Sequence, residues 1–152
     1  MYFFYISLFL CSISLAGDSL LQALITSETG ARLQAIRLRV VSENLANADS
    51  IGLNKKKEPY RRRIVIAKNI RDSKTGAKIV KYVVTRDKKT PFFKKYDPNH
   101  PMADKNGYVM LPNVVKDIER ADAMEANVSY EANLKLMKLS GDMIKNTIDL
   151  LK

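Results

Sequence analysis

The chain has 152 residues, a formal net charge of +10, a single cysteine (Cys11) and a single histidine (His100). Its length suits one compact domain or a small domain with helical extensions, and its 46% hydrophobic content can bury only a modest core. One cysteine excludes an internal disulfide and a cysteine-based metal site, and one histidine cannot build a zinc-binding cluster. We therefore expect no metal and no cofactor.

The first sixteen residues, MYFFYISLFLCSISLA, carry no charge. This stretch is shorter than the roughly 20 residues that a transmembrane helix needs. Its length matches the apolar region of a signal peptide, although no positive charge precedes it. An extension produced by a misassigned start codon is the other interpretation. We treat 1–16 as an atypical hydrophobic extension and leave it out of the fold prediction.

A long helix is predicted for residues 20–47, which contain no proline and one glycine, Gly30. Apolar residues recur every seven positions at Leu24, Ala31, Leu38 and Leu45. This spacing is typical of a coiled-coil seam. A second apolar stripe contains Leu33, Ile36 and Val40. A helix with two apolar faces needs more than one neighbour, as in a bundle or an assembly. Asn, Asp, Ser and Gly cluster after it, so the helix should stop near Asn47 to Gly52, and 17–52 forms the first helical segment.

The middle segment, 53–112, is basic and has the composition of strands. Between Lys55 and Lys95 there are sixteen Lys/Arg and three Asp/Glu, and the rest of the chain carries a net charge of −3. Runs rich in β-branched residues at 64–66 and 79–84 flank a turn-like stretch, which predicts a small antiparallel hairpin. A further extended segment begins near Phe92, and the turn Asn106-Gly107 precedes another short strand.

The basic block leaves two interpretations open. Its Lys and Arg side chains can contact phosphates, and nearby aromatic rings can stack on bases. The candidates are Lys55, Lys56, Lys57, Arg61, Arg62, Arg63, Tyr60, Tyr82, Phe92 and Phe93. Basic residues that alternate with Ile and Val are equally typical of the outer face of a strand. Nucleic-acid binding therefore remains the alternative function. Of the two interpretations we favour the outer face of a strand, so we do not expect nucleic acid to be the partner.

A second long helix is predicted for the last segment, 113–152. The residues expected to pack against neighbours lie at helical spacings: Ile118, Ala121, Val128, Leu136, Leu139 and Met143. The step from Val128 to Leu139 breaks a strict seven-residue repeat. The fold class is thus α+β, with long terminal helices that pack antiparallel as a coiled-coil-like pair and a small β-rich insertion between them.

No residue pattern indicates an enzyme. His100 has Asp97 and Asp104 nearby, but two prolines in the same stretch favour a histidine in a turn. Neither a nucleophile-elbow motif nor a phosphate-binding loop is present in the sequence. Acidic residues interleave with basic ones at Lys116, Asp117, Glu119, Arg120, Asp122 and Glu125, as on a solvated helix face. We expect no catalytic residue and no small-molecule substrate.

Four stretches resemble the flagellar axial-protein family, and within it rod subunits of the FlgC type. They are Asn44-Leu45-Ala46-Asn47, Pro59-Tyr60-Arg61-Arg62, the segment from Tyr96 to Val114, and Ser129-Tyr130-Glu131-Ala132-Asn133. The third is the most specific and contains Tyr96, Asp97, Pro98, His100, Pro101, Asn106, Gly107, Tyr108, Pro112 and Asn113. Together these stretches extend the resemblance over about residues 18–152.

The resemblance implies an exported structural subunit of the proximal rod in the flagellar basal body, within the periplasm. Another rod subunit of the same family is the alternative within this class. Its expected partners are other rod subunits, copies of itself and the flagellar export apparatus. The terminal helices would form the inner layer of a torque-transmitting tube and the β-rich insertion the outer layer. Asn44 and Asn47 would satisfy backbone groups, or adopt the left-handed conformation, where the first helix ends.

Overall fold

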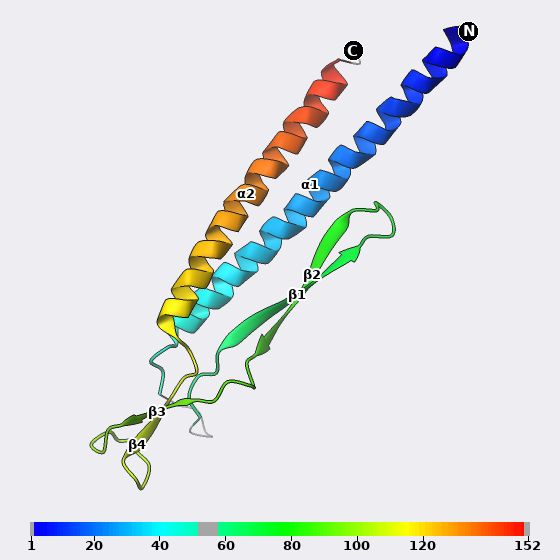
Figure 1. Ribbon diagram of the computed structural model, residues 1–152. Coiled ribbons are helices and arrows are strands. Elements are labelled where there is room, and N and C mark those ends of the chain that lie inside the picture. The colour runs from blue at the N-terminus through cyan, green and yellow to red at the C-terminus, as the bar shows by residue number, and fades with distance from the viewer. Residues whose placement is uncertain (1, 52–57, 151–152) are drawn as a thin grey trace. The chain divides into compact units, whose positions relative to one another are not determined.

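The computed structural model describes residues 2–51 and 58–150, and the side chains from residue 19 onward. In chain order the elements are α1 (Tyr2–Ala46), β1 (Arg63–Arg71), β2 (Lys78–Arg86), β3 (Phe93–Tyr96), β4 (Tyr108–Leu111) and α2 (Lys116–Asp149) (Figure 1). β1 pairs with β2 and β3 pairs with β4, so two small two-stranded sheets lie between the helices along the sequence. The predicted α+β class is confirmed. The predicted basic residues Lys55, Lys56 and Lys57 lie outside the described residues.

α1 is longer than the predicted helix, because its backbone continues through the apolar N-terminal stretch to Tyr2. Residues 2–16 contain neither proline nor glycine, so nothing in their backbone chemistry ends the helix. In the described part of the chain, no helix combines the length and apolar content that a membrane span requires.

The chain forms two compact units, and each is described by itself. The first contains Met1–Gln34, Ala67–Lys81 and Val128–Lys152, and the second contains Ala35–Ile66 and Tyr82–Asn127. Both helices and both strands of the first sheet contribute to each unit.

In the first unit, α1 and α2 approach each other through small and polar residues. Ser27, Ala31 and Ser140 are buried. A Cβ atom on Gly30 would lie 2.6 Å from Oδ1 of Asn133. Gly30 therefore permits a close approach between the two helices, which offsets its intrinsic cost to α1.

In the described part of the second unit, the buried core combines six apolar residues with four polar or charged ones. Its apolar part consists of Val40, Val41, Ala48, Val109, Val114 and Ala126. The largest side chains with less than 2% exposure include Glu119, Asn44 and Asn113 alongside Val109. Because buried polar groups are costly unless they are hydrogen-bonded, the fold of this unit depends on where these three side chains find partners.

The predicted seam differs from the helix face that is buried within the chain. On α1, Ala31 is buried, whereas the three leucines of the seam, Leu24, Leu38 and Leu45, are partly exposed. On α2, the exposed fractions are 53% for Ile118, 69% for Val128, 53% for Leu136, 56% for Leu139 and 46% for Met143, and Ala121 is also exposed. Their burial against other subunits remains a prediction.

Candidate functional site

A buried polar cluster in the second unit is centred on Asn44 of the Asn-Leu-Ala-Asn motif. The Asn44 amide nitrogen donates to the Arg63 carbonyl oxygen and to Oε2 of Glu119, both at 2.9 Å. Its Oδ1 accepts from the Arg63 backbone N–H at 2.8 Å and from the Tyr60 hydroxyl at 2.9 Å. Asn44 thus makes all four hydrogen bonds that a primary amide can make.

This arrangement corrects the prediction for Asn44. Asn44 lies inside α1 and satisfies both backbone groups of Arg63 on β1, instead of capping its own helix. Asn47 does bond to its own helix, because its side-chain nitrogen donates to the Glu43 carbonyl oxygen at 2.8 Å. Asn44 therefore joins α1, α2 and the start of β1.

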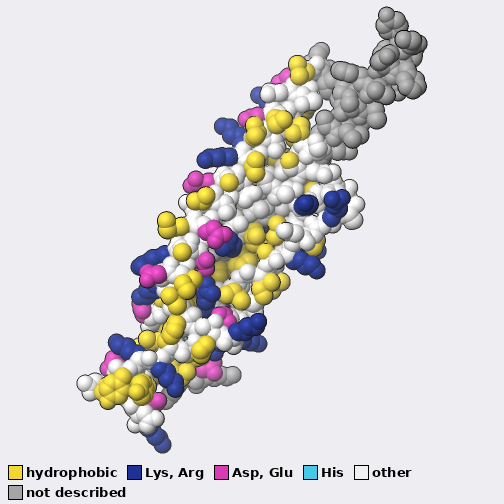
Figure 2. Space-filling view, in the orientation of Figure 1, with side chains coloured by type: hydrophobic (Ala, Val, Ile, Leu, Met, Phe, Trp, Pro, Cys, Tyr) yellow, Lys and Arg dark blue, Asp and Glu magenta, His cyan; other side chains and the backbone are white. Residues whose placement is uncertain are grey.

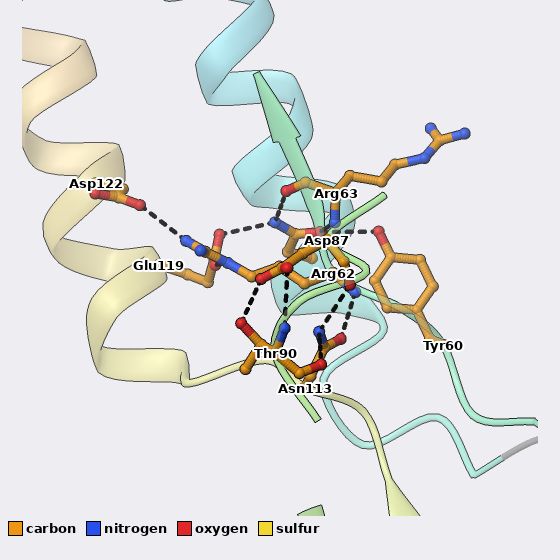
Figure 3. Close-up of polar contacts among 9 residues, drawn as sticks. Tyr60, Arg62, Arg63, Asp87, Thr90, Asn113, Glu119 and Asp122 are labelled. Atoms are coloured by element: carbon orange, nitrogen blue, oxygen red, sulfur yellow. Dashed lines mark hydrogen bonds and ion pairs between the residues drawn. The ribbon is translucent and has the colours of Figure 1, made fainter. Parts of the chain in front are cut away.

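A second buried amide, Asn113, holds the same strand from the other side. Its Oδ1 accepts from the Arg62 backbone N–H at 2.7 Å. Its nitrogen donates to the carbonyl oxygens of Asp87 and Thr90 at 3.3 and 3.2 Å (Figure 3). Asn113 thereby fixes the start of β1 to the turn that follows β2.

Glu119 is a buried carboxylate with charged and neutral partners. Arg62 donates from Nε to Glu119 at 2.5 Å and from its terminal nitrogen to Asp122 at 3.2 Å (Figure 3). The Asn44 side-chain nitrogen donates to the other carboxylate oxygen of Glu119. The prediction that Glu119 lies on a solvated helix face is wrong, since only 1% of the residue is exposed. A charge placed this deep is tolerated because it is paired and fully hydrogen-bonded.

Two further groups in this unit have shifted pKa values. Partial burial raises the pKa of the Tyr60 phenol, so its hydroxyl stays protonated and continues to donate to Asn44. The hydroxyl and the backbone N–H of Thr90 donate to Asp87 and lower the pKa of that carboxyl. Asp87 therefore stays ionised and shapes the turn between β2 and β3.

The three candidate phosphate-binding arginines have partners within the same unit. The Arg61 guanidinium lies 4.1 Å from the centre of the Phe92 ring and donates to the Asp87 carbonyl oxygen at 2.9 Å. Arg62 binds Glu119 and Asp122, and Arg63 binds Glu43 at 2.6 Å. These contacts favour an architectural role for the arginines over phosphate binding.

The Tyr96–Tyr108 part of the motif forms a turn and a hairpin. Nδ1 of His100 accepts from the Met102 backbone N–H at 3.1 Å, as expected for a histidine in a turn. Gly107 has a φ of 80°, and a Cβ there would lie 2.9 Å from the Tyr96 ring, so this position requires glycine. The rings of Tyr96 and Tyr108 meet edge to face with centroids 5.3 Å apart.

The outward face of α2 carries large apolar side chains among charged ones (Figure 2). Ala126 and Ser140 lie on the opposite, buried face. Among the described residues, no group of three or more His, Cys, Asp or Glu side chains is placed to hold a metal ion. A cavity of about 220 Å³ beside Val40 and Glu119 is smaller than a typical small-molecule pocket.

Some of these residues could have been identified from the sequence and others could not. Asn44 and Asn113 belong to the recognised motifs. Asp87 and Thr90 were missed, although an Asp followed three residues later by Thr is a turn signal that also occurs at Asp72 and Thr75. Glu119 was missed because a single acidic residue on a charged helix gives no sign that it is buried.

No family model matches the chain. It is 44% identical over 124 residues to the flagellar basal-body rod protein FlgC of Agrobacterium fabrum, covering 82% of this chain and 89% of the relative. The FlgC protein of Aquifex aeolicus is 35% identical over 129 residues, covering 84% and 93%. That of Salmonella typhimurium is 34% identical over 117 residues, covering 77% and 87%.

The terminal helices, the β-rich insertion and these relatives define the class, which is a structural rod component of the bacterial flagellar basal body. Within that class, the chain belongs to the FlgC family of flagellar basal-body rod proteins.

Proposed function

We propose that this chain polymerises with other rod subunits and with copies of itself through the exposed faces of its terminal helices. The observation that carries the proposal is the side-chain distribution on α2. Small and polar residues such as Ala126 and Ser140 are buried, whereas Val128, Leu136 and Leu139 are more than half exposed. Apolar surface of this kind marks an interaction site.

Burial of the exposed parts of these side chains on assembly would favour polymerisation. Burying one Val, Leu or Met side chain contributes about 1.5–3 kcal/mol. A contact between different patches on successive subunits does not close on itself, so it propagates into a filament. The same gain recurs at every subunit of the rod.

The polar cluster supports a second part of the proposal, the transmission of torque. A subunit that passes rotation along a tube must not bend where its strands meet its helices. Asn44 and Asn113 hold Arg63, the first residue of β1, and Arg62, which precedes it. Six hydrogen bonds join the two amides to distant parts of the chain, five to backbone atoms and one to the Glu119 carboxylate. We infer that this cluster is the stiff joint of the subunit.

The remaining parts of the proposal follow the family. We infer that the flagellar export apparatus delivers the chain and that no small molecule is its substrate. The division into an extension at 1–16, a first rod-helix segment at 17–52, a basic middle region at 53–112 and a second rod-helix segment at 113–152 also remains a proposal.

The test places a charge on each proposed assembly face. Cells carrying Leu38→Asp or Leu139→Asp should make the subunit, build no rods and not swim, because burying an unpaired carboxylate is costly. Lys138→Asp is the matched control, since Lys138 is exposed and lies off the apolar stripe of α2. His100→Asn should also swim. Motility together with basal bodies counted by electron microscopy decides the matter. Normal swimming of both leucine variants would contradict the proposal, and so would loss of motility in the His100 variant alone.

A further inference from the structure

The hairpin of β3 and β4 presents one face that the proposed helix contacts do not use. Its register pairs Lys94 with Met110 and Tyr96 with Tyr108, and these four side chains share one face of the pleat. Tyr96 is 64% exposed, Tyr108 43% and Met110 44%. Figure 2 shows hydrophobic side chains gathered at this end of the chain. We call these four residues the hairpin face.

The hairpin face has the chemistry of a protein-binding surface. Tyrosine and methionine are enriched in interface cores, and tyrosine buries a large area at little cost in conformational entropy. The two rings are inclined by 68° to each other, so they do not form the flat platform on which a sugar or a base would stack. Lys94 places a positive charge on this face. Its complement should therefore be apolar and acidic.

A surface of that kind lies in the same unit of the same chain. The first turns of α2 expose Ile118 by 53% and Met124 by 72%. The side chain of Asp117, which pairs with Arg120, is 90% exposed on this helix face, and that of Glu125, which pairs with Arg37, is 66% exposed. Asp117 and Met124, and likewise Ile118 and Glu125, are seven residues apart, so these residues lie on the side of α2 opposite the buried Glu119 and Ala126. We call them the acidic helix face.

From this complementarity we propose that the hairpin face of one copy docks on the acidic helix face of a neighbouring copy. Lys94 would lie near Asp117, and Met110 and the tyrosine pair would cover Ile118 and Met124. The inference rests on the proposed function, because it needs neighbouring copies in a rod. The inference goes further than the proposed function because it names the two surfaces that meet. A contact between two different surfaces is heterologous, and such contacts can extend a filament without closing into a ring.

The test is disulfide trapping between copies in assembled rods. Met110→Cys and Met124→Cys, each in a Cys11→Ser chain, are expressed separately and together in cells that lack the native chain. Both replaced residues are exposed, so neither change removes a core side chain. We expect a disulfide-linked dimer in basal bodies from the mixed strain and none from either single strain. Lys105→Cys, in the loop between β3 and β4, replaces Met110→Cys as the control and should give no dimer.

Charge reversal provides the second arm. Lys94→Glu should cause loss of the mixed dimer, and adding Asp117→Lys should restore it. The inference is overturned if purified basal bodies contain both cysteine variants but the mixed strain gives no dimer. Tyr96-dependent binding of the chain to peptidoglycan sacculi, without any dimer, would also overturn it. Absence of both variants from basal bodies would instead contradict the proposed function, so the two failures are distinguishable.

Discussion

Asn44 and Asn113 accept hydrogen bonds from two consecutive backbone amides, those of Arg63 at 2.8 Å and Arg62 at 2.7 Å. One asparagine lies on α1 and the other just before α2, so the start of β1 is held between two side chains that behave like strand partners. This gives the motif asparagines a physical role, since a buried backbone N–H must find an acceptor.

The first prediction concerns this role. Asn44→Ala should destabilise the chain by about 1–3 kcal/mol for every buried group that it leaves unpaired. The affected groups are both backbone groups of Arg63, one carboxylate oxygen of Glu119 and the Tyr60 hydroxyl. Urea unfolding followed by circular dichroism measures the loss. Asn47→Ala is the control and should cost less, because Asn47 bonds only to residues within three or four positions of itself. Equal losses in the two variants would contradict the prediction.

The second prediction concerns the two helical glycines. Gly141→Ala should stabilise the chain by about 1 kcal/mol, because a Cβ there meets nothing within 4 Å and alanine favours the helix. Gly30→Ala should not give this gain. Its Cβ would push the Asn133 amide away from the Ser129 carbonyl oxygen, to which that amide donates at 2.8 Å.

Thermal unfolding of Gly30→Ala, Gly141→Ala and the pair Gly30→Ala/Asn133→Ala tests this account. The paired variant should be more stable than Asn133→Ala alone, because the close contact is then absent. If Gly30→Ala by itself raised the melting temperature as much as Gly141→Ala does, the contact with Asn133 would carry no energetic weight.

The third prediction concerns pH. The pKa of Asp87 is lower in the folded chain than its ordinary value, chiefly because the Thr90 hydroxyl donates to it at 2.6 Å. The stabilisation is therefore fully present above the unfolded-state pKa of about 3.9 and is lost as the pH falls through the folded-state value. Thr90→Val should raise the pKa of Asp87 and leave that of Asp72 unchanged. Carboxyl chemical shifts in an NMR titration report both groups, and an unchanged Asp87 would refute the assignment.

The fourth prediction concerns the basic block. Arg61, Arg62 and Arg63 are engaged within the unit, so the chain should not bind nucleic acid selectively. A titration with DNA and RNA at about 150 mM salt, where electrostatic reach falls to roughly 8 Å, provides the measurement. Sub-micromolar binding that depends on base sequence would reopen the nucleic-acid hypothesis.

The predicted elements agree with the structure where the pattern is local. The apolar runs at 64–66 and 79–84 lie in β1 and β2, and the turn at Asn106-Gly107 precedes β4. The start of α1 was wrong because the apolar N-terminal stretch was set aside, although its residues permit a helix. Local signals of this kind locate strands and turns because they depend on neighbours in the chain.

The candidate site was harder to predict, because its partners are distant in the sequence. The helical spacing of apolar residues in α2 places Leu136 and Leu139 on an apolar stripe, but it cannot tell whether that stripe faces α1 or a neighbouring molecule. The buried face is instead marked by Ala126, Ser140 and Glu119, which no hydrophobic pattern selects. Burial of Glu119 depends on Arg62 and Asn44, which lie 57 and 75 residues away along the chain.

These long separations make folding of the second unit an all-or-none event. Until the residues of α2 are available, Asn44 and Arg62 lack the acceptors on Glu119 that complete the cluster. Closing such loops costs entropy before any contact is gained, so a chain cut short before Glu119 gains no stability from this cluster. Chains truncated before Glu119 should therefore remain open to proteolysis. The buried Glu119 carboxylate thus distinguishes chains that can complete this cluster from truncated chains that cannot.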